Sequence, residues 1–412
     1  MLLLLVQPTP QAQTAQSAQP KRSPLAAPVP TPAPTPAGQV RGVVQDGVLT
    51  VGTLLPMTGS LAFLGAATST AVDLAVQDVN AAGGVLGRPV RLIRADSGDS
   101  TDDLAVAAVR ELAGAETDVI VGAASNTVSL GVLDAVTEEG MTMISPSTTA
   151  TLLTTAYDRG LFFRTAPSDT LQGRLVGRLA AEDGNRTAAF IALDDPYGDV
   201  LVAEAEAELS KAGVEVVKKI RYREDDADFS RLEPIEADAL ILIGFTETLE
   251  VMRKLKRGDQ RWYLVDANLS DYSEDLPRGT LTGTRGTLAG VAVGPDFQAR
   301  MRALDPALTD FSYAAEAYDA VIVAALAARA AQGDLGKSVA GRLATVSGGG
   351  RPCTTFRACA DLLESGTDID YDGLSGRIEF DSNGDVGEGG FGVYTYKADN
   401  TYVRTETRVV SR

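Results

Sequence analysis

The chain has 412 residues, a net charge of −18 and no histidine, and 44 % of its residues are hydrophobic. This length and apolar content are enough for two domains or for one protein of two lobes. The acidic charge opposes binding to the phosphates of nucleic acids. The missing histidine removes the most common general base and the most common nitrogen ligand of metals, so an enzyme is less expected than a binding protein.

The first segment, residues 1–47, is predicted not to fold. It opens on MLLLLV, a run too short to span a bilayer, which is typical of the end of a secretory leader or of an ordinary disordered terminus. A stretch rich in Pro, Ala, Thr and Gln follows as far as Gly38, and such a composition cannot bury a core. We expect a leader remnant and a disordered spacer that tethers an extracytoplasmic domain to a cell surface.

Residues 48–149 alternate between expected strands and helices. The strands are nearly continuous apolar runs, which is typical of a parallel sheet covered by helices on both faces. Ligands bind such sheets beyond the carboxyl ends of the strands, and here those ends carry small hydroxyl and amide side chains, in 57–60, 123–126 and 147–149. In chain order we expect strand 48–56, helix 66–84, strand 88–96, helix 101–114, strand 118–124, helix 127–140 and strand 141–149.

A second block repeats this pattern after Pro167, which predicts a second, similar lobe. A long apolar helix over 311–332 is then expected to be buried on most of its surface. The chain ends in antiparallel strands with turns at Asn383-Gly384 and Asp399-Asn400. In the second block we expect helix 168–184, strand 187–195, helix 199–213, strands 214–222 and 237–245, helix 246–258 and strand 261–268.

Three strings resemble ligand motifs only superficially. Residues 381–385 (DSNGD) are followed by Val386 where a calcium loop needs glycine, so a hairpin turn is predicted. Residues 83–87 (GGVLG) follow a helix and precede a strand, the reverse of a nucleotide-binding glycine loop. Asp194 and Asp195, at a strand end, are expected to cap the next helix or to line a cleft. No metal and no cofactor are expected.

The chain has two cysteines, Cys353 and Cys359, which are too few for a zinc site. They lie six positions apart in a stretch bounded by Gly and Pro. Either they form a disulfide in an oxidising compartment or they are two unrelated thiols, and the extracytoplasmic character of the first segment favours the disulfide.

Several strings, in the right order, resemble the solute-binding proteins of ABC importers. The resemblance is to the branched-chain amino acid-binding (Leu/Ile/Val-binding) family, which has the type I periplasmic-binding-protein fold. It covers about residues 48–403. The most specific strings are PMTGSLAFLG, QDVNAAGGVLGRPV, VIVGAASNTVSLGVLDAVTEEGMTMISPSTT and LDDPYGDVL.

This resemblance implies an α/β protein of two similar, doubly wound parallel-sheet lobes joined by three hinge crossings. Lobe 1 would comprise residues 48–166 and 287–390, and lobe 2 residues 167–286 and 391–412. The implied function is that of a receptor, not an enzyme, which traps a small polar solute and delivers it to ABC permease subunits at the membrane. The solute would be an aliphatic, branched-chain amino acid. The same fold also serves ligand sensors or regulators, and binders of short amides, urea or aromatic acids.

The resemblance also implies which lobe 1 residues hold the carboxylate of the solute. Ser125 and Asn126 stand before a helix, whose N-terminus attracts anions, and Ser147, Thr148 and Thr149 follow the fourth strand. Asn126 and Thr149 could equally cap helices, or do both.

In lobe 2, Tyr197 would close over the solute and Asp266 would receive its α-ammonium group. Phe245 stands where the family often has tyrosine. Relatives often carry tryptophan near Leu64 and cysteine at the position of Ser125, so the side-chain preference is left open. The loop that touches the side chain of the solute is matched by Leu61, Phe63 and Leu64.

Overall fold

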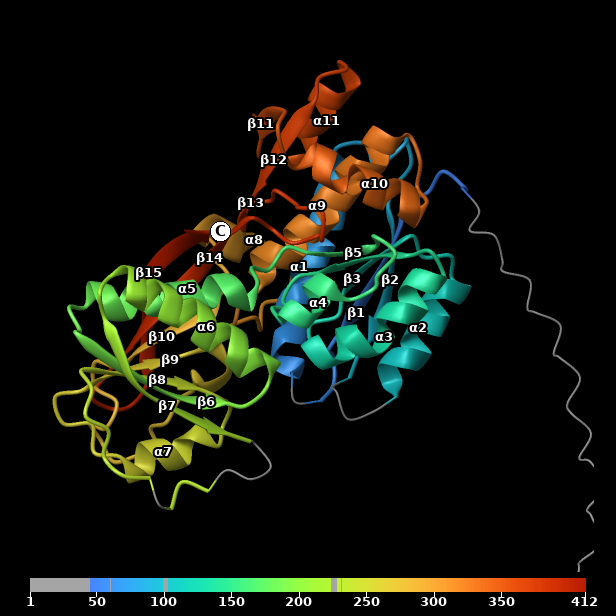
Figure 1. Ribbon diagram of the computed structural model, residues 1–412. Coiled ribbons are helices and arrows are strands. Elements are labelled where there is room, and N and C mark those ends of the chain that lie inside the picture. The colour runs from blue at the N-terminus through green and yellow to red at the C-terminus, as the bar shows by residue number, and fades with distance from the viewer. Residues whose placement is uncertain (1–44, 60, 99–102, 224–227, 231) are drawn as a thin grey trace, which may run out of the picture. The chain divides into compact units, whose positions relative to one another are not determined.

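The computed structural model describes residues 45–59, 61–98, 103–223, 228–230 and 232–412. The predicted leader and spacer, up to residue 44, and Ser60 in the first loop lie outside the described residues. Residues Gly42–Arg412 form one unit, within which the strands build two larger sheets and one small one (Figure 1). In the described part, no helix has the length and apolar character needed to cross a membrane.

The first sheet has five parallel strands in the order β2-β1-β3-β4-β5. Its strands are β1 (Thr50–Leu55), β2 (Arg91–Asp96), β3 (Val119–Gly122), β4 (Thr142–Ser145) and β5 (Phe162–Arg164). Its helices are α1 (Ala62–Ala81), α2 (Leu104–Gly114), α3 (Asn126–Glu138) and α4 (Thr151–Thr155). Because strand side chains alternate, Val51 and Val121 pack with α1 on one face, whereas Leu54 and Ile120 pack with α2 and α3 on the other. Both faces are therefore covered, as the apolar strands predict.

The second sheet has seven strands in the order β15-β14-β10-β9-β8-β6-β7. The five from β7 to β10 are parallel, and β14 and β15 add two antiparallel strands at the edge. These strands are β6 (Thr187–Leu193), β7 (Glu215–Tyr222), β8 (Ala239–Ile243), β9 (Arg261–Leu264), β10 (Arg285–Ala289), β14 (Glu388–Tyr396) and β15 (Tyr402–Ser411). Helices α5 (Asp169–Glu182) and α6 (Pro196–Lys211) cover one face, and α7 (Thr248–Lys254) lies on the other. The fold is thus the expected pair of doubly wound lobes.

The chain passes between the two lobes three times: from β5 to α5, from β10 to α8 (Pro295–Leu304), and from β13 (Gly376–Arg377) to β14. Strands β10 and β14 belong to the second sheet over their whole length, including residues 287–289 and 388–390, which the expected division assigns to lobe 1. We propose that the lobe borders lie just outside these two strands.

The rest of lobe 1 is built around α9 (Ala314–Ala331), an apolar helix buried along most of its length between α1 and α10 (Gly336–Val346). Beyond it, β11 (Arg351–Cys353), β12 (Ile369–Gly373) and β13 form a small sheet covered by α11 (Phe356–Glu364). Residues 381–385 form the predicted hairpin turn, with Gly384 at a φ of 75° and the bridge Phe380–Val386 beside it.

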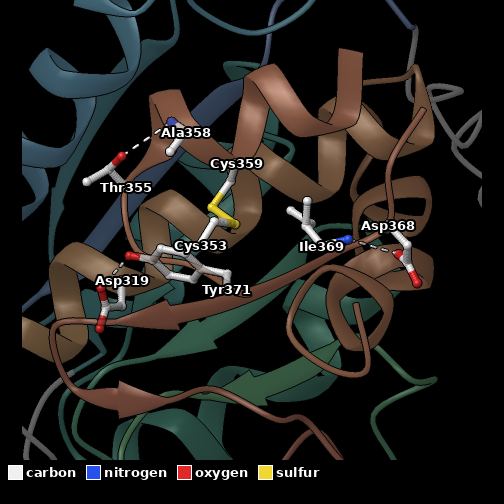
Figure 2. The surroundings of a disulfide bond; sticks show 8 residues. All are labelled: Asp319, Cys353, Thr355, Ala358, Cys359, Asp368, Ile369 and Tyr371. Carbon is white, nitrogen blue, oxygen red and sulfur yellow. Dashed lines mark hydrogen bonds between the residues drawn. A yellow bond between two sulfur atoms is a disulfide. The ribbon is translucent and has the colours of Figure 1, made fainter. Parts of the chain in front are cut away.

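The two cysteines form a disulfide that joins β11 to α11, as predicted. Figure 2 shows the bond between Cys353 and Cys359, with Tyr371 of β12 beside it. Both cysteines are buried, and Thr355 caps α11 by accepting a hydrogen bond from the N–H of Ala358. The bond therefore fastens the start of α11 to the small sheet of lobe 1.

Candidate solute-binding site

A cavity of about 510 Å³ lies beyond the carboxyl ends of the strands and is lined by both lobes. At one side α4 of lobe 1 contacts α6 of lobe 2, so the lobes meet beside the cavity. Ten of the expected solute-binding residues line it: Leu61, Phe63, Leu64, Ser125, Asn126, Ser147, Thr149, Tyr197, Phe245 and Asp266. Thr148, which we also expected there, is not among the lining residues: it is completely buried, and its N–H donates to Ser145 Oγ at 3.1 Å.

The N-terminus of α3 forms part of the lobe 1 wall. Ser125 is its N-cap, in extended conformation, and its hydroxyl oxygen accepts from the N–H of Val128 at 3.4 Å. Asn126 uses its side-chain oxygen to accept the N–H groups of Thr149 and Ala150, at 2.9 and 3.1 Å. The carboxamide of Asn126 therefore joins α3 to the loop after β4, and only its NH₂ group is left as a donor toward the cavity.

The loop after β4 is held from both sides. Ser145 Oγ donates to the carbonyl of Ala123 at 2.7 Å, and Ser147 Oγ donates to that of Ala124 at 3.2 Å. From the outer side Arg164, which is completely buried, donates to the carbonyl of Ala150 at 2.9 Å and pairs with Asp385 at 2.6 Å. This wall of the cavity is therefore preformed by hydrogen bonds, and sequence reasoning missed the part that Arg164 plays in it.

Asp266 opens a short 3-10 helix, η2 (Asp266–Asn268), after β9 in lobe 2. The hydroxyl of Tyr197 donates to its carboxylate at 2.7 Å, and the ring of Tyr197 is stacked on that of Phe245 with centroids 5.8 Å apart. Burial raises the pKa of Asp266 above its ordinary value, although the hydrogen bond from Tyr197 acts in the opposite direction. Burial, with Asp266 next to it, also raises the pKa of Tyr197, so this phenol stays protonated and remains a donor.

A second carboxylate, Asp169, lines the same cavity and was missed by sequence reasoning. It is the first residue of α5, its side chain is completely buried, and its N–H donates to the carbonyl of Thr149 at 2.9 Å. The hydroxyl of Thr149 lies close enough to lower its pKa in part, but neither carboxylate oxygen has a hydrogen bond of normal geometry within the described structure. Burial and then the charge of Asp266 raise the pKa of Asp169.

The charge of the cavity is one-sided. Asp195 is the third acid of the lining, and it also caps α6 by accepting the N–H of Gly198 at 2.8 Å, so both expectations for it hold. Asp194 does not line this cavity. Among the described lining residues there are three aspartates and no lysine or arginine. Such a site attracts a cationic group and repels a bare anion.

Tyr313 is a further lining residue that sequence reasoning did not single out. It precedes α9 with a φ of 57°, in the left-handed region that bulky residues rarely adopt. Although α9 belongs to lobe 1, Tyr313 is part of a hydrophobic cluster formed mainly by lobe 2 residues, among them Phe391 and Leu171. The one sequence signal for this lining residue is that an aromatic residue stands just before a long apolar helix.

Two α/β lobes on either side of a cleft are the architecture of solute-binding receptors of the periplasmic type. The profile of the periplasmic binding protein family matches residues 48–401, so the chain belongs to this family. It is 30 % identical over 359 residues to the chemotactic signal transduction system substrate-binding protein BasB of Halobacterium salinarum, covering 80 % of this chain and 83 % of that protein. It is 29 % identical to the Leu/Ile/Val-binding protein homolog 3 of Brucella melitensis, over 45 % of this chain and half of that one.

Solved structures share the fold. The branched-chain amino acid transporter substrate-binding protein LivJ of Streptococcus pneumoniae, in complex with isoleucine, has a TM-score of 0.64 at 19 % identity and covers 89 % of this chain and all of its own. A solute-binding protein of an ABC transporter from R. palustris, in complex with benzoate, has a TM-score of 0.61 at 18 % identity, covering 89 % of this chain and 98 % of its own. At these identities the likeness concerns the fold.

Proposed function

We propose that this chain is an extracytoplasmic receptor that traps an α-amino acid with an apolar side chain and delivers it to the permease of an ABC importer. The observation that supports this best is the pair Asp169 and Asp266, two carboxylates of lobe 2 that face the cavity together. An α-ammonium group would supply the positive charge that these acids lack among the described lining residues. A benzoate-like anion or a neutral amide would leave the negative charge of Asp169 and Asp266 unpaired, which is costly at a buried position.

The carboxylate of the amino acid would lie against lobe 1. The first turn of α3 offers backbone N–H groups and the positive end of the helix dipole, and Ser125 and the NH₂ group of Asn126 add polar groups beside it. The backbone N–H of Thr149 is bound by Asn126, and its hydroxyl lies toward Asp169. Thr149 would therefore stand between the two charged ends of the solute. Ser147 and Leu61, Leu64 and Phe63 would complete the lobe 1 wall.

The test is isothermal calorimetry of the full chain against α-amino acids, benzoate and a short amide. We expect binding of α-amino acids only, and a loss of roughly 2–5 kcal/mol when Asp266 is replaced by asparagine, because the ammonium group loses a charged partner. Benzoate or amide binding of equal strength would refute the assignment of the amino acid. The matched control is Glu274→Gln, a carboxylate of the same lobe that is exposed and does not line the cavity.

A second candidate function is that of a sensor on the same fold. It is favoured by the similarity over most of the chain to BasB, which serves a chemotactic signal transduction system. Transport assays in a strain with and without the chain separate the two functions. Loss of uptake supports delivery to a permease, and unchanged uptake with a lost response to the solute supports sensing.

A further inference from the structure

Exposed apolar side chains surround the solute-binding cavity. Twelve large hydrophobic residues are exposed in the described part of the chain, and four of them line this one cavity: Phe63, Leu130, Leu152 and Phe245. Three come from the lobe 1 helices α1, α3 and α4, and Phe245 comes from the loop after β8 in lobe 2. Exposed apolar side chains gathered around a cavity mark a surface that an apolar ligand covers.

The aromatic part of this surface is held in place. The N–H of Phe245 donates to Glu247 at 2.9 Å, and the hydroxyl of Thr248 donates to the carbonyl of Phe245 at 2.7 Å. Glu247 is itself bound by the hydroxyl of Tyr222 at 2.6 Å. The ring of Phe245 lies nearly parallel to that of Tyr197, with 16° between the planes, and Tyr197 in turn reaches Asp266. A continuous aromatic surface therefore leads from the carboxylates to the mouth.

The volume of the cavity also exceeds that of a branched-chain amino acid. If each non-hydrogen atom occupies at most about 30 Å³, the share of a water molecule in the liquid, leucine fills at most about 270 Å³. That is roughly half of the 510 Å³ available. Phenylalanine fills at most about 360 Å³ on the same count, and tryptophan at most about 450 Å³. A leucine held at the two aspartates would therefore cover less of the apolar mouth than a larger aromatic side chain would.

We propose that the solute is an aromatic α-amino acid, whose ring lies between Phe63 of lobe 1 and the Tyr197–Phe245 pair of lobe 2. This inference rests on the proposed function, because it takes the ammonium group to be bound by Asp169 and Asp266. An aromatic ring gains from stacked or edge contacts with these rings beyond what the burial of apolar area gives. Phe63 and Phe245 are then specificity-determining residues for the side chain.

The experiment is calorimetry of the full chain with phenylalanine, leucine and 3-phenylpropionate, which has the ring and the carboxylate but no ammonium group. We expect phenylalanine to bind on the order of tenfold more tightly than leucine, and 3-phenylpropionate to bind far more weakly than either. Phe245→Leu and Phe63→Leu should each reduce the ratio of the phenylalanine affinity to the leucine affinity by about threefold or more.

The control is Tyr157→Leu, an aromatic residue that is exposed and does not line the cavity, and it should leave the preference unchanged. If leucine binds as tightly as phenylalanine, or if the preference survives both phenylalanine substitutions, the inference is overturned and the proposed function stands. If no α-amino acid binds while 3-phenylpropionate does, the proposed function falls with it.

Discussion

Replacing Asp169 by asparagine is expected to stabilise the solute-free protein and to weaken solute binding. The side chain is completely buried without a normal hydrogen bond, and burial raises its pKa. A raised pKa means that the folded state binds the proton more tightly than the unfolded state does. The stability that this group contributes is therefore complete below its ordinary pKa and is lost as the pH rises through the raised value. Asparagine removes that loss, and at about pH 8 we expect a gain of roughly 1–3 kcal/mol in the free energy of unfolding.

The same substitution removes one of the two charges that face the ammonium group. Removing one partner of a buried charge pair costs roughly 2–5 kcal/mol, so the affinity for an α-amino acid should fall at least about thirtyfold. Because the carboxylate must ionise to pair with the ammonium group, the affinity of the unmodified protein should also fall as the pH is lowered through the raised pKa, and this dependence should weaken in the variant.

Denaturant unfolding and calorimetry at about pH 5 and pH 8 measure both effects. Asp194→Asn is the matched control, since this acid stands at the end of β6, is exposed and does not line the cavity. A variant that loses stability and affinity together would show that Asp169 supports the fold rather than the solute. An unchanged affinity would show that the ammonium group lies elsewhere.

Three further predictions concern stability. Burial raises the pKa of Asp118 to about 7. The contribution of this group to the free energy of unfolding is therefore lost as the pH rises through that value. Asp118→Asn should reduce the change in the free energy of unfolding between acidic and alkaline pH, by at most about 4 kcal/mol. Replacing both Cys353 and Cys359 by serine should cost about 2 kcal/mol in denaturant titrations, as the closed loop is short, and should leave calorimetric solute affinity unchanged. Arg164→Met removes the buried partner of Asp385, which keeps Arg412 at 3.2 Å, and should cost up to about 3 kcal/mol. Adding Asp385→Leu should restore part of this stability, and no recovery in unfolding experiments would contradict this account.

The alternating pattern of apolar strands and helices was sufficient to predict both lobes and the edge at which the cavity lies. Strand order was harder, because β10 and β14 pair across 98 intervening residues, from Ala289 to Glu388, that build part of the other lobe. The spacing of hydrophobic residues within one segment carries no information about a pairing between such distant segments. For this reason the lobe borders that we propose differ by a few residues from those that the resemblance implies.

Side-chain roles within the cavity were predictable only in part. Asp169 follows a serine at the start of a helix, where an acid ordinarily serves the helix dipole, and only the tertiary fold buries it beside Asp266. Asn126 stands at a helix start as well, but its oxygen turns to the backbone of the neighbouring loop. Position along the chain locates such residues at the correct edge of the sheet, and the contacts between elements decide what each atom binds.

The side chain of Tyr313 constrains how the cleft can open. Tyr313 lines the cavity and belongs to a hydrophobic cluster formed mainly by lobe 2 residues, while the helix that follows it runs through lobe 1. Pulling the lobes straight apart would draw this ring into water at a cost of roughly 2 kcal/mol, whereas turning one lobe about the ring leaves it covered. We therefore expect the cleft to open by rotation of one lobe about Tyr313 rather than by straight separation of the lobes.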